Sequence, residues 1–283
     1  MISNRLSEEH VKQPIRNKRF SMRFEIKGES VFVTTGGRDF DPAKPVLIFL
    51  HGAGFDQSVW NQQSRYFAHR NHSVLAVDFP GNGRSTGRAP AEIGELADWV
   101  PHLMDASGIQ EATLVGHSMG ALVALECAVR YPKRISGISL MGAAAEMPVH
   151  PELLNAAKNN QPLAYDLVCS WGLGIRGHIG GAPVPGMNLM GGGLSLMASG
   201  QKEALAAGLE ACNKYSSGKE SAPKVSCSSL IVIGTEDRMS PAFKGRELSS
   251  LIPGCKQEIL PGCGHMMMLE DSKSSLEALK KNL

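Results

Sequence analysis

Short apolar runs alternate with segments of helical periodicity through the first half of the chain. The runs are rich in β-branched residues and too short for helices, so they are interpreted as strands. Apolar residues at helical spacing occupy 60–69 and 92–106 between them. This alternation is typical of a mostly parallel sheet with helices on its faces. The strands predicted in this half are 31–35, 45–50, 73–77, 112–115 and 135–141.

The alternation stops at about residue 145. Two helical patterns, 151–169 and 194–215, surround the stretch 171–193, which is crowded with glycine, proline and methionine. A long irregular stretch between helices inside such a domain favours a lid. The strand and helix rhythm returns with strands at 229–234 and 257–260 and helices at 241–251 and 267–281. We therefore expect a polar lead-in at 1–22, a core made of 23–144 and 224–283, and a helical cap at 145–223.

The sequence Gly-His-Ser-Met-Gly at 116–120 lies between a predicted strand and an alanine-rich helical segment. A strand that turns directly into a helix forces the residue at the turn into a sparsely populated backbone conformation and exposes its side chain. Glycines at both ends fit, because side chains there would collide. The helix start would also direct free N–H groups at whatever the serine oxygen attacks. The pattern predicts that Ser118 is an exposed nucleophile.

Composition narrows the class of protein. The 283 residues suffice for one large domain or a core with a modest insertion, and 42% hydrophobic with 20% charged residues is ordinary for a soluble protein. A net charge of +2 without a basic stripe argues against nucleic acid or anionic membrane as a partner. The apolar runs are too short to span a bilayer or act as a secretion signal. We expect a cytoplasmic protein acting on a small molecule, and a homodimer is left open.

The six cysteines have no short paired spacing, which favours reduced, mostly buried thiols. Cys255, Cys263 and His265 could be drawn as metal ligands, but no C-x-x-C pair or fourth ligand supports such a site. No phosphate-binding glycine motif occurs either. We therefore expect neither a metal nor a cofactor.

Five motifs in order resemble the α/β-hydrolase superfamily, in its esterase- and lipase-like serine hydrolases. The resemblance covers about residues 30–283 apart from the cap, and it implies an α/β fold with a mostly parallel sheet, helices on both faces and a helical lid inserted after the sixth strand. The motifs are 51–54 (HGAG), 78–85 (DFPGNGRS), the serine turn, 234–237 (GTED) with Pro241, and 262–265 (GCGH).

A serine hydroxyl needs a base within hydrogen-bond reach, and the base needs a third group to orient it. The order nucleophile, acid, base along the chain predicts Ser118, Asp237 and His265 as the catalytic residues. The neighbouring Glu236 competes for the acid role, but Asp237 occupies the position that the family uses. His117 is expected to be a packing residue, because adjacent side chains on a sharp turn diverge.

The resemblance also implies an oxyanion hole formed by the backbone N–H groups of Met119 and Ala53, with Gly54 as the alternative for the second donor. It implies that His51 braces the glycine loop. Asp78 is expected to belong to a rigid turn rather than to the chemistry.

An apolar, adaptable pocket is expected under the cap, suited to an acyl or alkyl group. The predicted function is cleavage of carboxylic esters through an acyl-enzyme. Hydrolysis of carbon–carbon bonds in vinylogous diketones is an alternative with the same triad, and a non-catalytic ligand receptor is another, because fold alone does not dictate activity. The predicted pocket residues are Phe55, Trp171, His178, Met187, Met190 and Met266, with Leu194 and Met197 also on the cap.

Overall fold

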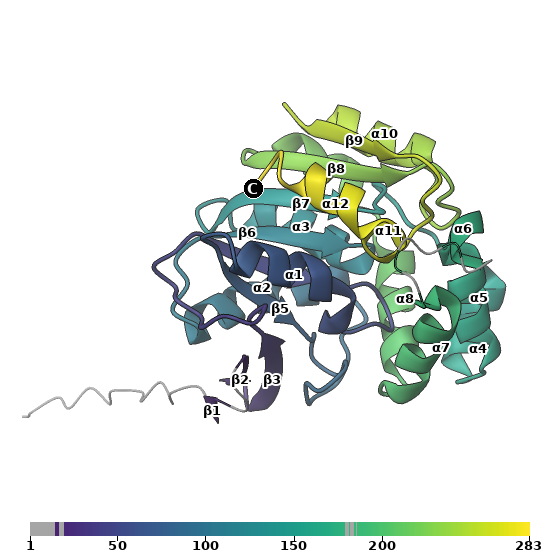
Figure 1. Ribbon diagram of the computed structural model, residues 1–283, viewed down its shortest axis with the longest axis horizontal. Helices are drawn as coiled ribbons and strands as arrows, with labels where there is room; N and C mark the ends of the chain where they lie inside the picture. Colours follow the sequence, from purple (N-terminus) through teal and green to yellow (C-terminus); the bar gives the residue numbers. More distant parts are fainter. Residues whose placement is uncertain (1–14, 17–19, 179–180, 182–183, 185) are drawn as a thin grey trace, which may run out of the picture.

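Nine strands form one sheet in the computed structural model, which describes residues 15–16, 20–178, 181, 184 and 186–283 (Figure 1). The order is β1-β2-β3-β5-β4-β6-β7-β8-β9. The pairings from β5 to β9 are parallel, and those among β1, β2, β3 and β5 are antiparallel. The strands are β1 (Ile15–Arg16), β2 (Ser21–Ile26), β3 (Glu29–Thr34), β4 (Val46–Leu50), β5 (Ser73–Val77), β6 (Ala112–His117), β7 (Ile135–Met141), β8 (Ser228–Gly234) and β9 (Lys256–Leu260).

Helices cover both faces of the sheet, because its central strands are apolar on both sides. Every residue of β4 and β5 is buried, as expected for parallel strands between two helical layers. Helices α1 and α12 pack together on one face, and α2 and α3 pack together on the other, with α10 against β8. These helices are α1 (Asn61–Ala68), α2 (Ile93–Ala106), α3 (Met119–Arg130), α10 (Ala242–Leu251), α11 (Met267–Glu270) and α12 (Ser272–Leu279), with a 3₁₀ turn, η1 (Gln57–Trp60), before α1.

A helical insertion connects β7 to β8 and lies beside the carboxyl ends of the parallel strands (Figure 1). We call its first five helices, α4 to α8, the cap. The insertion follows the seventh strand and not the sixth, because β1 and β2 precede the first strand that the sequence predicted. Its helices are α4 (Pro151–Lys158), α5 (Leu163–Gly172), α6 (Ile175–His178), α7 (Leu189–Ser199), α8 (Ala204–Lys214) and α9 (Gly218–Ser221), followed by a 3₁₀ turn, η2 (Ala222–Lys224).

Three of the long helices that the sequence predicted are each divided into two shorter helices in the structure. The pattern at 151–169 breaks between α4 and α5, where Asn160 has a φ of 51° and Pro162 has no N–H to continue a helix. The pattern at 194–215 breaks at Gly200. The pattern at 267–281 breaks at Asp271, whose side chain accepts a hydrogen bond from the Ser274 N–H and caps α12. Local capping groups thus override the apolar periodicity.

The N-terminal boundary also differs from the prediction. Strand β2 begins at Ser21, inside the predicted lead-in, and most of 1–22 lies outside the described residues. All six cysteines are free thiols, and four of them are buried. In the part of the chain that the structure describes, no helix is long and apolar enough to cross a membrane.

Candidate active site

Ser118 lies at the sharp turn between β6 and α3. Its φ of 53° and ψ of −117° are outside the regions that L-residues prefer, and such a conformation costs about 1–3 kcal/mol. The turn closes only because glycines flank it. A Cβ on Gly116 would meet the carbonyl of Gly120, and a Cβ on Gly120 would meet the carbonyls that end β4. The local sequence therefore places the serine side chain at the carboxyl edge of the sheet.

His265 and Asp237 form a buried pair at the same edge. His265 Nδ1 donates a hydrogen bond of 2.8 Å to Asp237 Oδ2, and both side chains are at most 3% exposed. The remaining capacity of the carboxylate is filled by the Met239 and Ser240 N–H groups and the Ser240 hydroxyl. Burial alone would raise the pKa of Asp237, but His265 and the Ser240 bonds hold it below its usual value. Asp237 therefore remains a carboxylate and fixes the imidazole.

The neighbouring Glu236 points elsewhere. Its Oε2 accepts a hydrogen bond of 2.7 Å from the N–H of Ile175 at the start of α6. Of the two acids that the sequence offered, the structure brings Asp237 to the histidine and Glu236 to the cap.

Ser118 and His265 line one cavity of about 140 Å³ under the cap. The pair is not hydrogen-bonded, and His265 Nε2 is buried without any partner among the described residues. A buried polar atom without a partner is costly, and catalytic hydrogen bonds are often long before substrate binds. The free nitrogen is therefore available to a proton on the serine or on a bound molecule.

Two backbone N–H groups beside the serine have no acceptor among the described residues. Met119 is the first residue of α3, where an N–H has no intrahelical partner. Ala53 follows β4 in the glycine loop. His51 spans this loop, because its Nδ1 donates to the Gly52 carbonyl and its Nε2 accepts from the Phe79 N–H. Burial lowers the pKa of His51 to about 4, so the neutral ring can make both bonds.

His117 does more than pack. Its Nε2 donates a hydrogen bond of 3.0 Å to the main-chain carbonyl of His265, and the two ring centroids are 4.7 Å apart. Burial, together with the neighbouring His265, keeps the pKa of His117 well below its usual value, so the ring is neutral. The residue beside the nucleophile therefore holds the loop that carries the histidine.

Glu270 is a buried carboxylate that the sequence did not single out. It accepts hydrogen bonds from the N–H groups of Gly264 and Met266, on either side of His265, and from Gly174 in the cap. In addition, the Gly172 carbonyl at the end of α5 accepts from the His265 N–H at 2.7 Å. The loop that carries His265 is thus fastened to the end of α5. Four residues lie between His265 and Glu270, and only the folded α11 brings the Glu270 carboxylate back to the loop.

A known protein family and solved structures match this fold. The model of the alpha/beta hydrolase family matches residues 47–276. The chain belongs to this family. The crystal structure of the enol-lactonase from Burkholderia xenovorans has a TM-score of 0.81 at 22% identity, covering 92% of this chain and 98% of that one.

Two curated relatives match this chain over only part of their own length. The chain is 28% identical over 258 residues to the dihydrolipoyllysine-residue acetyltransferase component of the acetoin cleaving system of Cupriavidus necator, covering 84% of this chain and 63% of that protein. It is 34% identical over 105 residues to 3-oxoadipate enol-lactonase 2 of Acinetobacter baylyi, covering 37% of this chain and 39% of that protein. The chain thus spans less than two thirds of the length of either relative.

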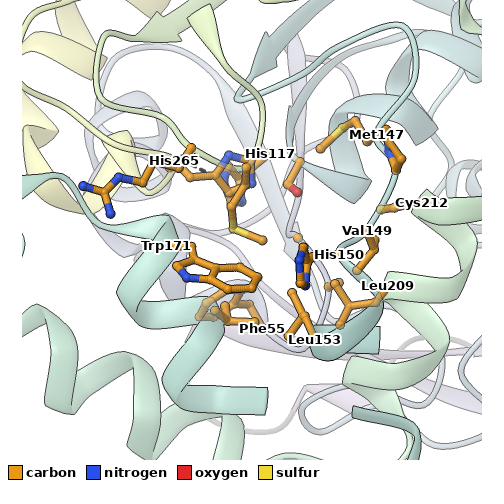
Figure 2. A pocket seen from close by; sticks show the side chains of 17 residues that line it. Phe55, His117, Met147, Val149, His150, Leu153, Trp171, Leu209, Cys212 and His265 are labelled. Carbon is orange, nitrogen blue, oxygen red and sulfur yellow. Dashed lines mark hydrogen bonds between the residues drawn. The ribbon is translucent and has the colours of Figure 1, made fainter. Parts of the chain in front are cut away.

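The cap and the glycine loop both line the cavity (Figure 2). Phe55 and Trp171 of the predicted pocket residues lie in its wall, and the Trp171 ring meets the His150 ring edge to face at 5.3 Å. The sequence carried no signal for the other side chains of the insertion in the wall, because their direction depends on how the helices pack. They are Met147, Val149, His150, Leu153, Val168, Leu209 and Cys212.

The remaining predicted pocket residues lie elsewhere. Met187 and Met266 line a second cavity, which shares Phe55 with the first. The prediction for His178 is wrong, since this exposed residue lies in a separate hollow beside Glu236 and its ring bonds to the Leu173 carbonyl. The prediction for Met190 is also wrong, since it packs against the core and lines neither cavity. Both residues lie near the end of a short helix, whose direction the sequence does not reveal.

Proposed function

We propose that the protein is a serine hydrolase that cleaves carboxylic esters of small to medium apolar substrates through an acyl-enzyme on Ser118. The observation that carries the proposal is the buried His265–Asp237 pair: His265 lines the same cavity as the strained serine, and its Nε2 has no partner among the described residues. A neutral histidine oriented by a carboxylate is the arrangement that activates a serine hydroxyl.

In the first half-reaction, His265 takes the Ser118 proton while the serine oxygen bonds to the ester carbonyl carbon. The N–H groups of Met119 and Ala53 stabilise the negative oxygen of the tetrahedral intermediate. The carbon–oxygen bond to the alcohol then breaks, and His265 returns the proton to the leaving alcohol. In the second half-reaction, a water gives a proton to His265 while its oxygen bonds to the acyl carbon. The bond between that carbon and the Ser118 oxygen then breaks, His265 returns the proton to the serine oxygen, and the acid leaves. Each step conserves protons, and no cofactor is needed.

The relatives support ester chemistry. The 3-oxoadipate enol-lactonase 2 of Acinetobacter baylyi is named for opening an enol-lactone, which is a cyclic ester. The cavity suits an apolar acyl group, because most of its lining side chains are aliphatic, aromatic or sulfur-containing. We also propose that the protein acts in the cytoplasm.

Replacement of the nucleophile tests the proposal. With p-nitrophenyl acetate and butyrate, Ser118→Ala is expected to lower kcat by at least ~10⁴-fold. The control Ser250→Ala removes an exposed hydroxyl on α10 and is expected to keep full activity. An undiminished rate in Ser118→Ala would overturn the proposal. Wild-type turnover of dienol ketones but of no ester would favour carbon–carbon bond hydrolysis, and tight binding without turnover would favour a receptor.

A further inference from the structure

A second cavity of about 180 Å³ lies next to the catalytic one. The two cavities share two wall residues, Phe55 and Val168, and both side chains are buried. The second cavity also touches Met266, the residue after His265. It therefore lies beside the catalytic cavity, between η1 and the cap helices α5 and α7.

The lining of the second cavity is apolar. Ser58 and Asn188 are the only polar side chains among its described lining residues, and Asn188 already caps α7 by accepting a hydrogen bond from the Gly191 N–H. No charged residue is among them. The other side chains in the wall include Val59, Leu173, Leu189, Leu196 and Leu269. Such a cavity offers few partners to a polar ligand, and it suits an aliphatic one.

Phe55, which lies in the wall of both cavities, belongs to the loop that is expected to hold the ester carbonyl. Ala53 supplies an N–H for the developing oxyanion, and Phe55 lies two residues later with its own N–H bonded to the Gly52 carbonyl at 3.3 Å. A chain attached to a carbonyl carbon at Ser118 therefore starts beside Phe55. Because Phe55 also lines the second cavity, a chain that passes this ring would reach that cavity.

We propose that the second cavity binds the distal part of a straight aliphatic acyl chain whose carbonyl carbon is held at Ser118. Phe55 divides the proximal from the distal part of this binding site. The inference rests on the proposed function and names its substrate class, which is esters of medium-chain aliphatic acids. Each methylene group buried in an apolar site strengthens binding by about fourfold, so a chain that reaches the second cavity gains markedly over acetate.

Gly192 offers a way to fill this cavity. It lies on α7 in the cavity wall, and a Cβ built on it meets nothing within 4 Å. Gly192→Leu therefore places an aliphatic side chain in open space, and it also replaces a residue with poor helix propensity. The matched control is Ser195→Leu, which adds the same side chain at a residue of the same helix that does not line the cavity.

The first experiment compares p-nitrophenyl decanoate with p-nitrophenyl acetate. Gly192→Leu is expected to lower the decanoate-to-acetate ratio of kcat/KM by about tenfold or more, because the loss of room for two methylenes alone corresponds to such a factor. Ser195→Leu is expected to keep the wild-type ratio. Phe55→Ala removes the divider and is expected to raise the ratio. An unchanged ratio in both Gly192→Leu and Phe55→Ala would overturn the proposal.

A binding measurement separates this inference from the proposed function. Calorimetric titration of Ser118→Ala with decanoate is expected to show binding that a second substitution, Gly192→Leu, weakens about tenfold. If no ester is hydrolysed, the proposed function fails, and this titration still decides the inference. Equal decanoate affinity with and without Gly192→Leu would contradict the second site even if ester hydrolysis depends on Ser118.

Discussion

The carboxyl edge of the sheet and the cap above it place their side chains by different means. Ser118, Asp237 and His265 each lie in a short loop after a parallel strand, namely β6, β8 and β9. Strand register and buried neighbours fix these loops. The cap consists of short helices, and α7 contains three consecutive glycines, Gly191 to Gly193, which weaken a helix. The candidate catalytic residues thus lie at the edge of the sheet, and the cap helices supply much of the cavity wall.

Carboxylates join the two regions. Glu270 and Glu236 hold the end of α5 and the start of α6 to the catalytic loops. At the other end of the insertion, Glu126 of α3 accepts hydrogen bonds from the Tyr215 and Ser221 hydroxyls. Both ends of the insertion are therefore anchored to the core, although only the first anchor touches the loop of His265. The difference between the two anchors can be measured.

The largest effect is expected at the acid. Asp237→Asn keeps the size of the side chain but changes the hydrogen-bonding pattern that orients His265, so kcat is expected to fall by about 10³–10⁴-fold. Steady-state kinetics with p-nitrophenyl butyrate measure the loss. The control is Glu236→Gln, which alters the adjacent carboxylate bonded to the cap and is expected to cost less than about tenfold. Similar losses in both variants would contradict the assignment of Asp237.

A smaller effect separates the two anchors. Glu270→Gln leaves fewer acceptors for the three N–H groups of Gly174, Gly264 and Met266. It is expected to lower kcat by about tenfold or more, because a small misplacement of His265 is costly. Glu126→Gln weakens the distant anchor and its ion pair with Arg130. It is expected to lower Tm while kcat stays within about threefold of wild type. Equal effects on kcat would show that the anchors do not differ.

The smallest effect concerns pH and the turn that contains Asp78. Burial raises the pKa of Asp78 to about 7, while the Arg84 and Gln57 N–H groups act against this rise. Because the folded protein binds this proton more tightly than the unfolded chain, the contribution of Asp78 to the free energy of unfolding falls as pH rises from about 4 to about 7. Thermal unfolding across this range is expected to show a smaller decline in Asp78→Asn. A decline as steep as in the wild type would contradict this role.

Much of the catalytic edge could be predicted because its signals are local. Residues 73–77 and 135–141 were predicted as strands with the bounds that β5 and β7 have. The glycines around Ser118 predicted the strained turn, because a sharp strand-to-helix junction needs small residues on both sides. The pairing of His265 with Asp237 followed from the order of motifs.

The cap could be predicted only as a helical region. The breaks at Asn160 and Gly200 depend on local capping and left-handed conformations that apolar periodicity does not encode. The positions of His178 and Met190 depend on how short helices pack on one another. The roles of Glu270 and His117 likewise require loops from distant parts of the chain to meet. A sequence pattern reports period and composition, and these features depend on tertiary contacts.

Covalent trapping of the nucleophile tests the central claim most directly. The protein is treated with a fluorophosphonate, and the modified peptide is mapped by mass spectrometry. We predict one adduct, on Ser118, and a strongly slowed reaction in His265→Ala, because the histidine activates the serine oxygen. An adduct on another serine, or ester hydrolysis that survives complete modification of Ser118, would contradict the account.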